Sequence, residues 1–203
     1  MTVKEETREL TLRQRHGRAI NAVAELLRRR LSVPNIYLEP PSSLVSADIL
    51  AVDRGGAGDL HGVEIKLERD LVPFGGQRKK PSSREEINDQ AKEAYETFNA
   101  KYLQNLRAIH RQVMSMPVHY RYLALPADSF HRAFSDLAHF GLFPENGVGR
   151  LGFILITDRQ EEPPAADLAV VPERFRVDPA KLKAIETKLL SKSRPGPDIY
   201  VRI

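Results

Sequence analysis

Residues 46–68, SADILAVDRGGAGDLHGVEIKLE, decide the fold class and the candidate chemistry of this 203-residue chain. Two apolar segments, Ser46–Asp53 and Gly62–Glu68, each predict a short strand, and a glycine-rich turn separates them. Three charged residues in these segments, Asp48, Glu64 and Lys66, have apolar neighbours. Buried charge without a partner costs several kcal/mol, so such residues need an ion-pair partner or a function. The stretch therefore predicts a hairpin that carries a site.

Outside this hairpin the hydrophobic pattern alternates between helical and extended segments. Before it, apolar residues recur at helical spacing from Glu9 to Leu31, and Pro34 separates that helix from a strand at Asn35–Glu39. After it, a long amphipathic pattern predicts a helix from Arg84 to about Met114. Further strands are predicted at 120–125, 151–157 and 165–171, helices at 129–140 and 179–191, and a last extended segment at 199–203. The order predicts one α/β domain over residues 1–203, with a central mixed sheet that begins antiparallel and is flanked by helices.

The composition is that of an ordinary globular protein, with 41% hydrophobic and 29% charged residues. The absence of cysteine excludes a disulfide framework and a thiolate metal site, and it fits a reducing compartment. The first ten residues lack the apolar core of a signal peptide, and no apolar run is long enough for a membrane span. These features predict a cytoplasmic protein without a membrane partner.

The net charge of +4 permits nucleic-acid binding, and two local clusters concentrate the positive charge. Arg28–Arg30 ends the first predicted helix. The second cluster lies in and just after a loop bounded by glycine, proline and serine, and consists of Arg78, Lys79, Lys80 and Arg84. Such clusters can neutralise phosphates, although either could instead be a solvated basic face. We expect the second cluster to contact a nucleic-acid backbone.

The spacing within the second strand predicts a particular geometry. A period of two places Glu64 and Lys66 on one face of the strand, with Ile65 directed into the opposite core. The hairpin can bring Asp48 to the same face. Carboxylate oxygens suit Mg²⁺ or Mn²⁺, and Mg²⁺ typically uses one or two carboxylates together with water and substrate phosphate. A cation held there could activate water for phosphodiester hydrolysis, with Lys66 orienting the water or balancing charge.

The order of a helix, a strand, an Asp-bearing strand and a Glu-x-Lys strand resembles the catalytic core of the PD-(D/E)XK nuclease superfamily, also called restriction-endonuclease-like. The resemblance covers about Ala19 to Arg69. Glu64-Ile65-Lys66 matches the motif in full, whereas Ser46-Ala47-Asp48 lacks the proline that often precedes the aspartate. The resemblance implies a restriction-endonuclease-like fold and a Mg²⁺- or Mn²⁺-dependent deoxyribonuclease.

The resemblance also implies a role for each site residue. Asp48, Glu64 and the backbone carbonyl of Ile65 would bind the metal, and Lys66 would be catalytic. Members of the superfamily often carry an acidic residue on the helix before the sheet; Glu25 is the best candidate here, and Glu39 is a second. DNA is the implied partner, and homodimers are common among such proteins.

Other interpretations stay open. Glu64 and Lys66 could form an ion pair of little energetic value on a half-exposed sheet. The chain could also be a non-catalytic nucleic-acid-binding or assembly module that retains the nuclease fold. Gln90 and Tyr95 only weakly match a Gln and Tyr pair of some nucleases, because five residues separate them. His61 lies near the site in sequence, but we interpret it as a surface turn residue rather than a substrate contact.

Overall fold

A hairpin at the middle of one sheet organises the structure. The computed structural model describes residues 11–30, 32–33, 35–40, 42–43, 45–53, 58–71, 84–139, 151–157, 164–192 and 201–202, and it describes the backbone only for 69, 84–95, 98, 139, 190–192 and 201–202. The elements in chain order are α1 (Leu12–Arg30), β1 (Asn35–Leu38), β2 (Ile49–Val52), β3 (Leu60–Ile65), α2 (Glu68–Leu71), α3 (Arg84–Ser115), β4 (Tyr120–Pro126), α4 (Ala127–His139), β5 (Leu151–Thr157), β6 (Ala165–Val170), α5 (Pro179–Lys192) and β7 (Val201–Arg202). The predicted order of elements is confirmed, and α2 is added where an extended segment and a loop were predicted.

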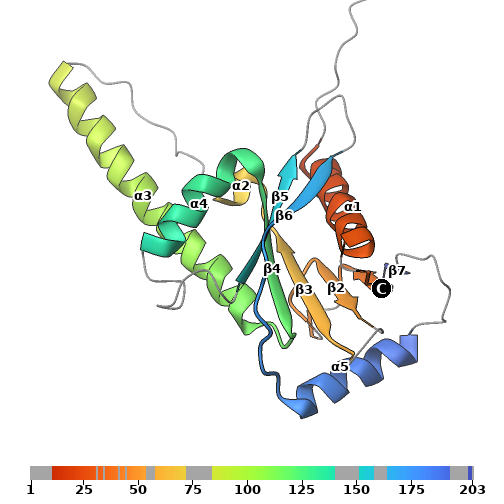
Figure 1. Ribbon diagram of the computed structural model, residues 1–203. Coiled ribbons are helices and arrows are strands. Elements are labelled where there is room, and N and C mark those ends of the chain that lie inside the picture. Colours follow the sequence, from red (N-terminus) through yellow and green to blue (C-terminus); the bar gives the residue numbers. More distant parts are fainter. Residues whose placement is uncertain are drawn as a thin grey trace, which may run out of the picture.

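The seven strands form a single mixed sheet in the order β6-β5-β4-β3-β2-β1-β7 (Figure 1). β1, β2 and β3 pair antiparallel, which confirms the predicted antiparallel start. β3, β4 and β5 pair parallel, and β6 returns antiparallel to β5. The change of direction follows from the connections, because a short turn can join β2 to β3, whereas a parallel partner needs a crossover, here through α2 and α3. The α/β class is therefore confirmed.

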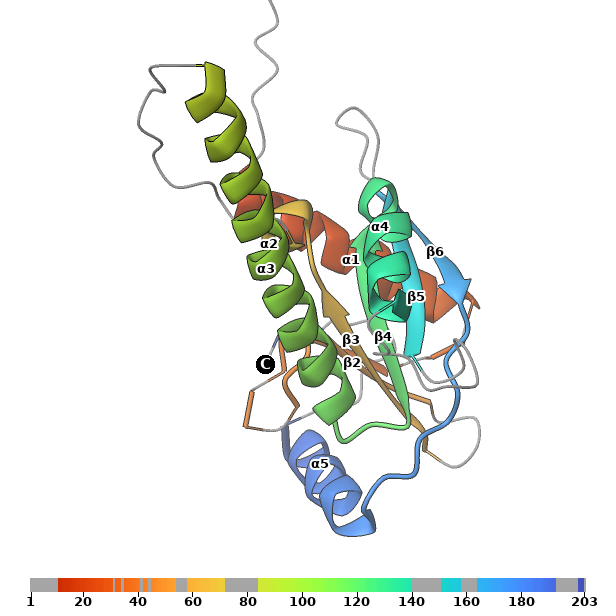
Figure 2. The ribbon, with the colours of Figure 1, turned by 90° about the vertical axis from the view of Figure 1, so that its left-hand side faces the viewer.

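Helices cover both faces of this sheet. α1 lies on one face, and α3 and α4 lie on the other (Figures 1 and 2). The apolar stripe of α1 packs on inward residues of β2 and β3, and the buried residues of this core include Val23, Leu27, Ile49, Val63 and Ile65. Alternate residues of the same strands point to the α3 side, as the period of two requires. Each fully buried aliphatic side chain contributes roughly 1.5–3 kcal/mol, so the two cores hold β2 and β3 firmly in place.

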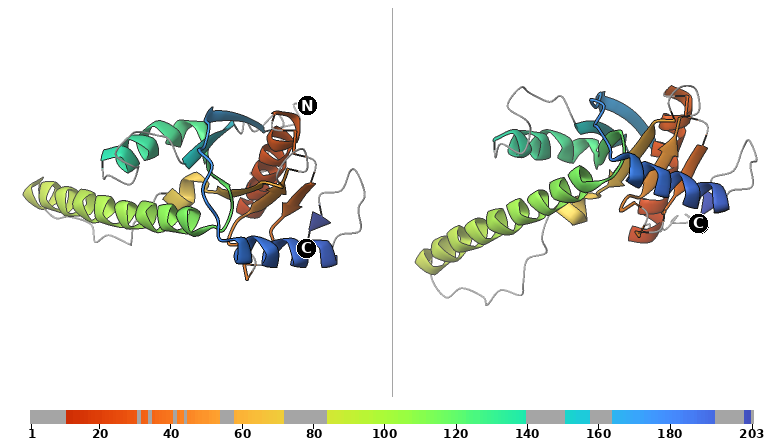
Figure 3. Two further views of the ribbon diagram at one scale, coloured as in Figure 1. Left: turned by 60° about the horizontal axis from the view of Figure 1, so that its bottom comes forward. Right: turned by 90° about the horizontal axis from the view of Figure 1, so that it is seen from below.

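The middle of β3 is pressed closely against the connection that leads from α3 to β4. A Cβ added at Gly62 would lie 2.9 Å from Met116 Sδ and 3.0 Å from Val118 Cγ2. Only glycine fits at this position without displacing a neighbour. The N-terminal half of α3, by contrast, projects beyond the sheet (Figure 3). None of the helices in the described part of the chain is long and apolar enough to cross a membrane.

Candidate active site

The charged residues of the hairpin meet at one end of the sheet. Asp48 directly precedes β2, and Glu64 lies at the end of β3, just before Lys66. In the antiparallel pair, Ile49 is opposite Val63, so continuing the register by one residue places Asp48 opposite Glu64. The sequence predicted strands over Ser46–Asp53 and Gly62–Glu68, which would place both Asp48 and Lys66 inside strands; this is wrong, because Asp48 precedes β2 and Lys66 follows β3. At strand ends, charged side chains keep contact with solvent while the strands remain apolar.

Backbone hydrogen bonds fix the orientation of Asp48. Its Oδ2 accepts a hydrogen bond of 2.7 Å from the Ile65 N–H. Its own N–H donates to the Val63 carbonyl (2.9 Å), and its carbonyl accepts from the Glu39 N–H (2.7 Å). Oδ1 lies 3.7 Å from Nε2 of His16 on α1. The carboxylate is thus held between the end of β3 and the beginning of α1.

Glu64 forms an ion pair with Lys66 in surroundings that disfavour its charge. Lys66 Nζ lies 2.5 Å from Glu64 Oε1, and the Glu64 side chain is only 4% exposed. The two side chains meet as predicted, and Ile65 packs in the α1-side core. Burial raises the pKa of Glu64, and the nearby Asp48 charge raises it further, whereas Lys66 and a hydrogen bond from Gln112 lower it. Gln112, on α3, also donates from Nε2 to Ser46 Oγ at 3.3 Å.

His16 was not anticipated, and the structure brings it to the site. Hydrogen bonding to Asp48 raises the pKa of His16; burial opposes this, and the charges of Asp48, Asp70 and Glu39 act in the same direction as the hydrogen bond. Several carboxylates therefore surround one imidazole. No sequence signal links a helical histidine to an aspartate 32 positions later, because their proximity depends on how α1 crosses the sheet.

A cavity of about 280 Å³ opens over this cluster. It is bounded by the first turns of α1, by the end of β3 and by α2, and its lining residues are Leu12, Arg13, His16, Asp48, Ile65, Lys66, Leu67 and Asp70. α2 begins here because Asp70 Oδ2 accepts a 2.8 Å hydrogen bond from the Leu67 N–H. The cavity thus places an arginine, a lysine and an imidazole beside the carboxylates.

Glu25, the acidic candidate on the helix before the sheet, lies away from Asp48. Glu25 pairs with Arg29 on the surface of α1. Nine residues separate Glu25 from His16, which is two and a half helical turns, so the two side chains leave α1 on opposite sides. Glu25 is therefore not part of the cluster around Asp48, and this assignment is corrected. The second acidic candidate, Glu39, is close enough to influence His16.

The structure does not describe the side chains that were predicted to contact nucleic acid. Arg78, Lys79 and Lys80 lie outside the described residues, and of Arg84 only the backbone, at the start of α3, is described. The other basic cluster is exposed at the end of α1 far from His16, where Arg30 Nη2 lies 3.1 Å from Asp167 Oδ1.

The interpretation of His61 as a surface turn residue is wrong. The residue lies in β3, at the opposite end from Lys66. It is buried within the strand, and its ring stacks on Tyr120 with ring centroids 4.7 Å apart. Its Nδ1 lies 3.2 Å from the Tyr122 hydroxyl. Sequence proximity to the site was misleading because three strand residues separate His61 from Glu64, a rise of about 10 Å.

The donor set at the cluster fits a small divalent cation with two carboxylates. Among the described residues, no group of three or more His, Asp or Glu side chains is arranged to hold a metal ion. Mg²⁺, however, is often bound through one or two carboxylates and retained water. A cation near Asp48 and Glu64 would relieve the unfavourable charge that raises the pKa of Glu64. Lys66 would then share Glu64 Oε1 with the cation or give up its ion pair with that oxygen.

Comparison with known proteins does not assign a family. No protein-family model matches the chain, and no curated protein matches it. Among solved structures, the chain is similar to the SPO1766 protein of unknown function from Silicibacter pomeroyi. The two share 15% sequence identity with a TM-score of 0.42, over 86% of this chain and 83% of that chain. A likeness at this level carries no functional argument, so function has to be inferred from the site itself.

Proposed function

We propose that this chain is a metal-dependent nuclease with a restriction-endonuclease-like fold that hydrolyses phosphodiester bonds in DNA. The observation that carries the proposal is the meeting of Asp48, Glu64 and Lys66 beside a cavity, with burial and the Asp48 charge both raising the pKa of Glu64. A buried carboxylate whose charge is disfavoured by a neighbouring carboxylate is a common feature of sites that bind cations or catalyse reactions. The element order from α1 to β3 also agrees with the order on which the resemblance in sequence is based.

Each residue has a role that follows from its position. Asp48 and Glu64 would hold Mg²⁺ or Mn²⁺, with the Ile65 carbonyl as a further ligand. The cation would supply Lewis-acid stabilisation of the negative charge that develops on the phosphate. The Ile65 N–H fixes Asp48, and Gln112 steadies Glu64. The Lys66 side chain, which is 21% exposed and lines the cavity, is placed to orient water and balance charge.

The test is a cleavage assay on supercoiled, linear and branched DNA with Mg²⁺ or Mn²⁺. Wild-type protein should cleave at least one of these forms, and Lys66→Ala and Asp48→Asn should not. Glu25→Gln is the matched control, because it alters a carboxylate outside the cluster. Mn²⁺ binding followed by electron paramagnetic resonance gives a second readout, and Asp48→Asn should weaken it. Cleavage that survives Lys66→Ala would remove the catalytic assignment.

The second candidate is a non-catalytic nucleic-acid-binding module with the same fold. The close pairing of Lys66 with Glu64 favours it, because the ammonium already neutralises the carboxylate that a cation would need. This candidate predicts DNA binding without cleavage and without Mn²⁺ binding at Asp48.

A further inference from the structure

The C-terminal half of α3 has a charge pattern that the proposed site does not use. Residues 99–115 contain no aspartate or glutamate, and the exposed cations among them are Lys101, Arg107 and Arg111. The opposite side of the helix packs on the sheet, and its buried residues are Tyr102, Leu106, Ile109 and Val113. At 3.6 residues per turn, Arg107 and Arg111 project away from that buried stripe. This face of α3 is therefore purely cationic.

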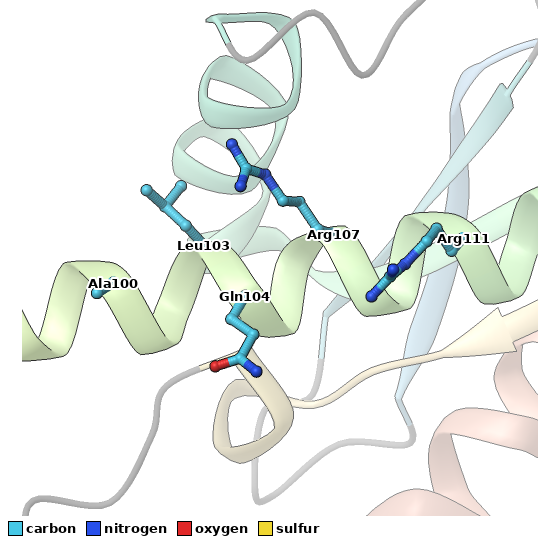
Figure 4. Close-up of a pocket in the computed structure, with 5 residues that line it drawn as sticks. All are labelled: Ala100, Leu103, Gln104, Arg107 and Arg111. Carbon is cyan, nitrogen blue, oxygen red and sulfur yellow. The ribbon is translucent and has the colours of Figure 1, made fainter.

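Two of these cations border a cavity of about 530 Å³, nearly twice the volume of the cavity at Asp48. Its lining residues are Ala100, Leu103, Gln104, Arg107 and Arg111, and we call them the α3 groove. In Figure 4, Arg107 and Leu103 point toward α4, whereas Gln104 points toward α2. Small Ala100 leaves room between these side chains. A guanidinium can donate two parallel hydrogen bonds to a phosphate, and an amide adds further donors.

The helix dipole does not account for this pattern. Cations near a helix C-terminus are favourable, but the effect falls off within the last turn. Arg107 lies eight residues before Ser115, which is more than two turns, and Lys101 lies further still. The helix dipole therefore gives no reason for cations this far from the helix end.

The α3 groove and the cavity at Asp48 share no lining residue, but α3 also carries a residue that contacts the proposed active site. Gln112, which hydrogen-bonds Glu64 and Ser46, follows Arg111 directly in the helix. Five residues separate Arg107 from Gln112, a rise of roughly 7 Å along the axis. Along the helix axis, both arginines therefore lie within about two turns of the residue that contacts Glu64.

We propose that the α3 groove binds the backbone phosphates of the DNA that flank the bond to be cut. The inference rests on the proposed function and extends it, because it assigns the substrate a path on the protein. Contacts between the two guanidinium groups and DNA phosphates do not depend on the base sequence. The contribution of the α3 groove to DNA affinity should therefore be electrostatic and the same for different sequences.

The experiment measures DNA binding by the full-length protein in EDTA, where no cleavage occurs. Fluorescence anisotropy of labelled single-stranded and duplex DNA is followed from about 50 to about 250 mM salt. Arg107→Gln/Arg111→Gln should reduce the slope of log K against log salt by about 1.4 for single strands or about 1.8 for duplex. The corresponding loss of affinity at about 0.1 M salt is about 25-fold or about 60-fold.

The matched control is Lys181→Gln/Lys183→Gln, which removes two exposed cations from α5. It should leave the slope within about 0.3 of wild type. Circular dichroism checks that both double variants are folded. A loss of affinity for one DNA form but not for the other identifies the form that the groove contacts.

The outcomes separate this inference from the proposed function. A wild-type slope in Arg107→Gln/Arg111→Gln, with cleavage intact, overturns the α3 groove alone. An effect of the α3 variant without any cleavage by wild type supports the groove and favours the non-catalytic module. Equal losses in the α3 and α5 variants show a general charge effect and overturn the inference. Absence of any DNA binding by wild type overturns both.

Discussion

The two ends of β3 carry two clusters of ionisable side chains that differ in the balance of their charges. At one end, Asp48, Lys66 and His16 border a cavity, and Glu64 pairs with Lys66. At the other end, Asp59, His61 and His119 lie with Arg174. Both clusters contain carboxylates, a cation and imidazole, and the same strand positions them. Composition therefore does not distinguish a candidate site from a structural cluster.

At the far end, each group is held in the charge state that its partners favour. Arg174 donates to both carboxylate oxygens of Asp59, with the shortest bond at 2.7 Å, and this pairing lowers the pKa of Asp59. The Leu60 N–H donates to His119 Nδ1 at 3.0 Å, so that nitrogen carries no proton and the ring is neutral beside Asp59. Burial lowers the pKa of His119 and lowers that of His61 to about 4.

At the site end, the balance is reversed. Burial and then the Asp48 charge raise the pKa of Glu64, and the hydrogen bond to Asp48 raises the pKa of His16. At this end, a carboxylate whose charge is disfavoured lies beside a cavity, whereas at the far end the carboxylate of Asp59 is paired with Arg174. A disfavoured charge next to a cavity, rather than the presence of ionisable groups, therefore distinguishes the candidate functional end.

The largest effect is expected from the site end. Lys66→Ala should lower the DNA cleavage rate by about 10²- to 10⁴-fold, as is typical when a positioned acid, base or charge is removed. Rates measured on plasmid DNA with Mg²⁺ test this, and circular dichroism reports folding. A comparable loss in His119→Gln would contradict the division into a functional and a structural end.

Acid should destabilise the fold chiefly through the far end. The pKa of His61 is lowered from 6.5 to about 4, so between these values the unfolded chain binds a proton that the folded chain does not. This contribution to the free energy of unfolding is complete above pH 6.5 and is lost as the pH falls toward 4. The total loss is about 3 kcal/mol, of which about 2 kcal/mol is lost by about pH 5. His119 acts with the same sign. Urea unfolding at about pH 7 and about pH 5 measures the loss.

His61→Phe is the control for this effect, since it keeps a ring beside Tyr120 but cannot titrate. The variant should lose most of the pH dependence. Histidine NMR titrations sharpen the contrast further: His16 should titrate above 6.5 and His61 and His119 below it, because their pKa values are shifted in opposite directions. An unchanged pH dependence in His61→Phe would show that other groups govern acid stability.

Between the two ends, substitution at Gly62 should reduce stability by overpacking. Gly62→Ala places a methyl group against Met116 and Val118 and should cost about 1–3 kcal/mol. Gly17→Ala is the matched control, because a methyl group added at Gly17 meets nothing within 4 Å and alanine favours a helix by roughly 0.5–1 kcal/mol. Thermal unfolding of the two variants should give shifts of opposite sign.

The smallest effect is expected at Glu25. Its exposed pair with Arg29 is of the i, i+4 type, so Glu25→Gln should change stability by less than about 0.5 kcal/mol. Cleavage should stay within about twofold of wild type, whereas Glu64→Gln should abolish it. A large loss of activity in Glu25→Gln would return this residue to the site.

Local signals in the sequence were sufficient for most of the fold. The apolar stripe before Leu31, the helix that begins at Arg84 and the strand at 151–157 were predicted because periodicity and breakers are local properties. The end of β3 was less well defined. Leu67 reads as a continuation of a strand, but the hydrogen bond to Asp70 starts α2 there. That bond depends on the surrounding chain rather than on propensity.

For the site, the period of two in a strand is enough to predict that Glu64 and Lys66 share a face and that Ile65 opposes them. The position of Asp48 opposite Glu64 at the strand ends, the presence of His16 beside them and the absence of Glu25 become visible in the folded structure alone. These facts depend on strand register and on the angle at which α1 crosses the sheet. Both result from packing between residues far apart in the chain, and no short-range pattern encodes them.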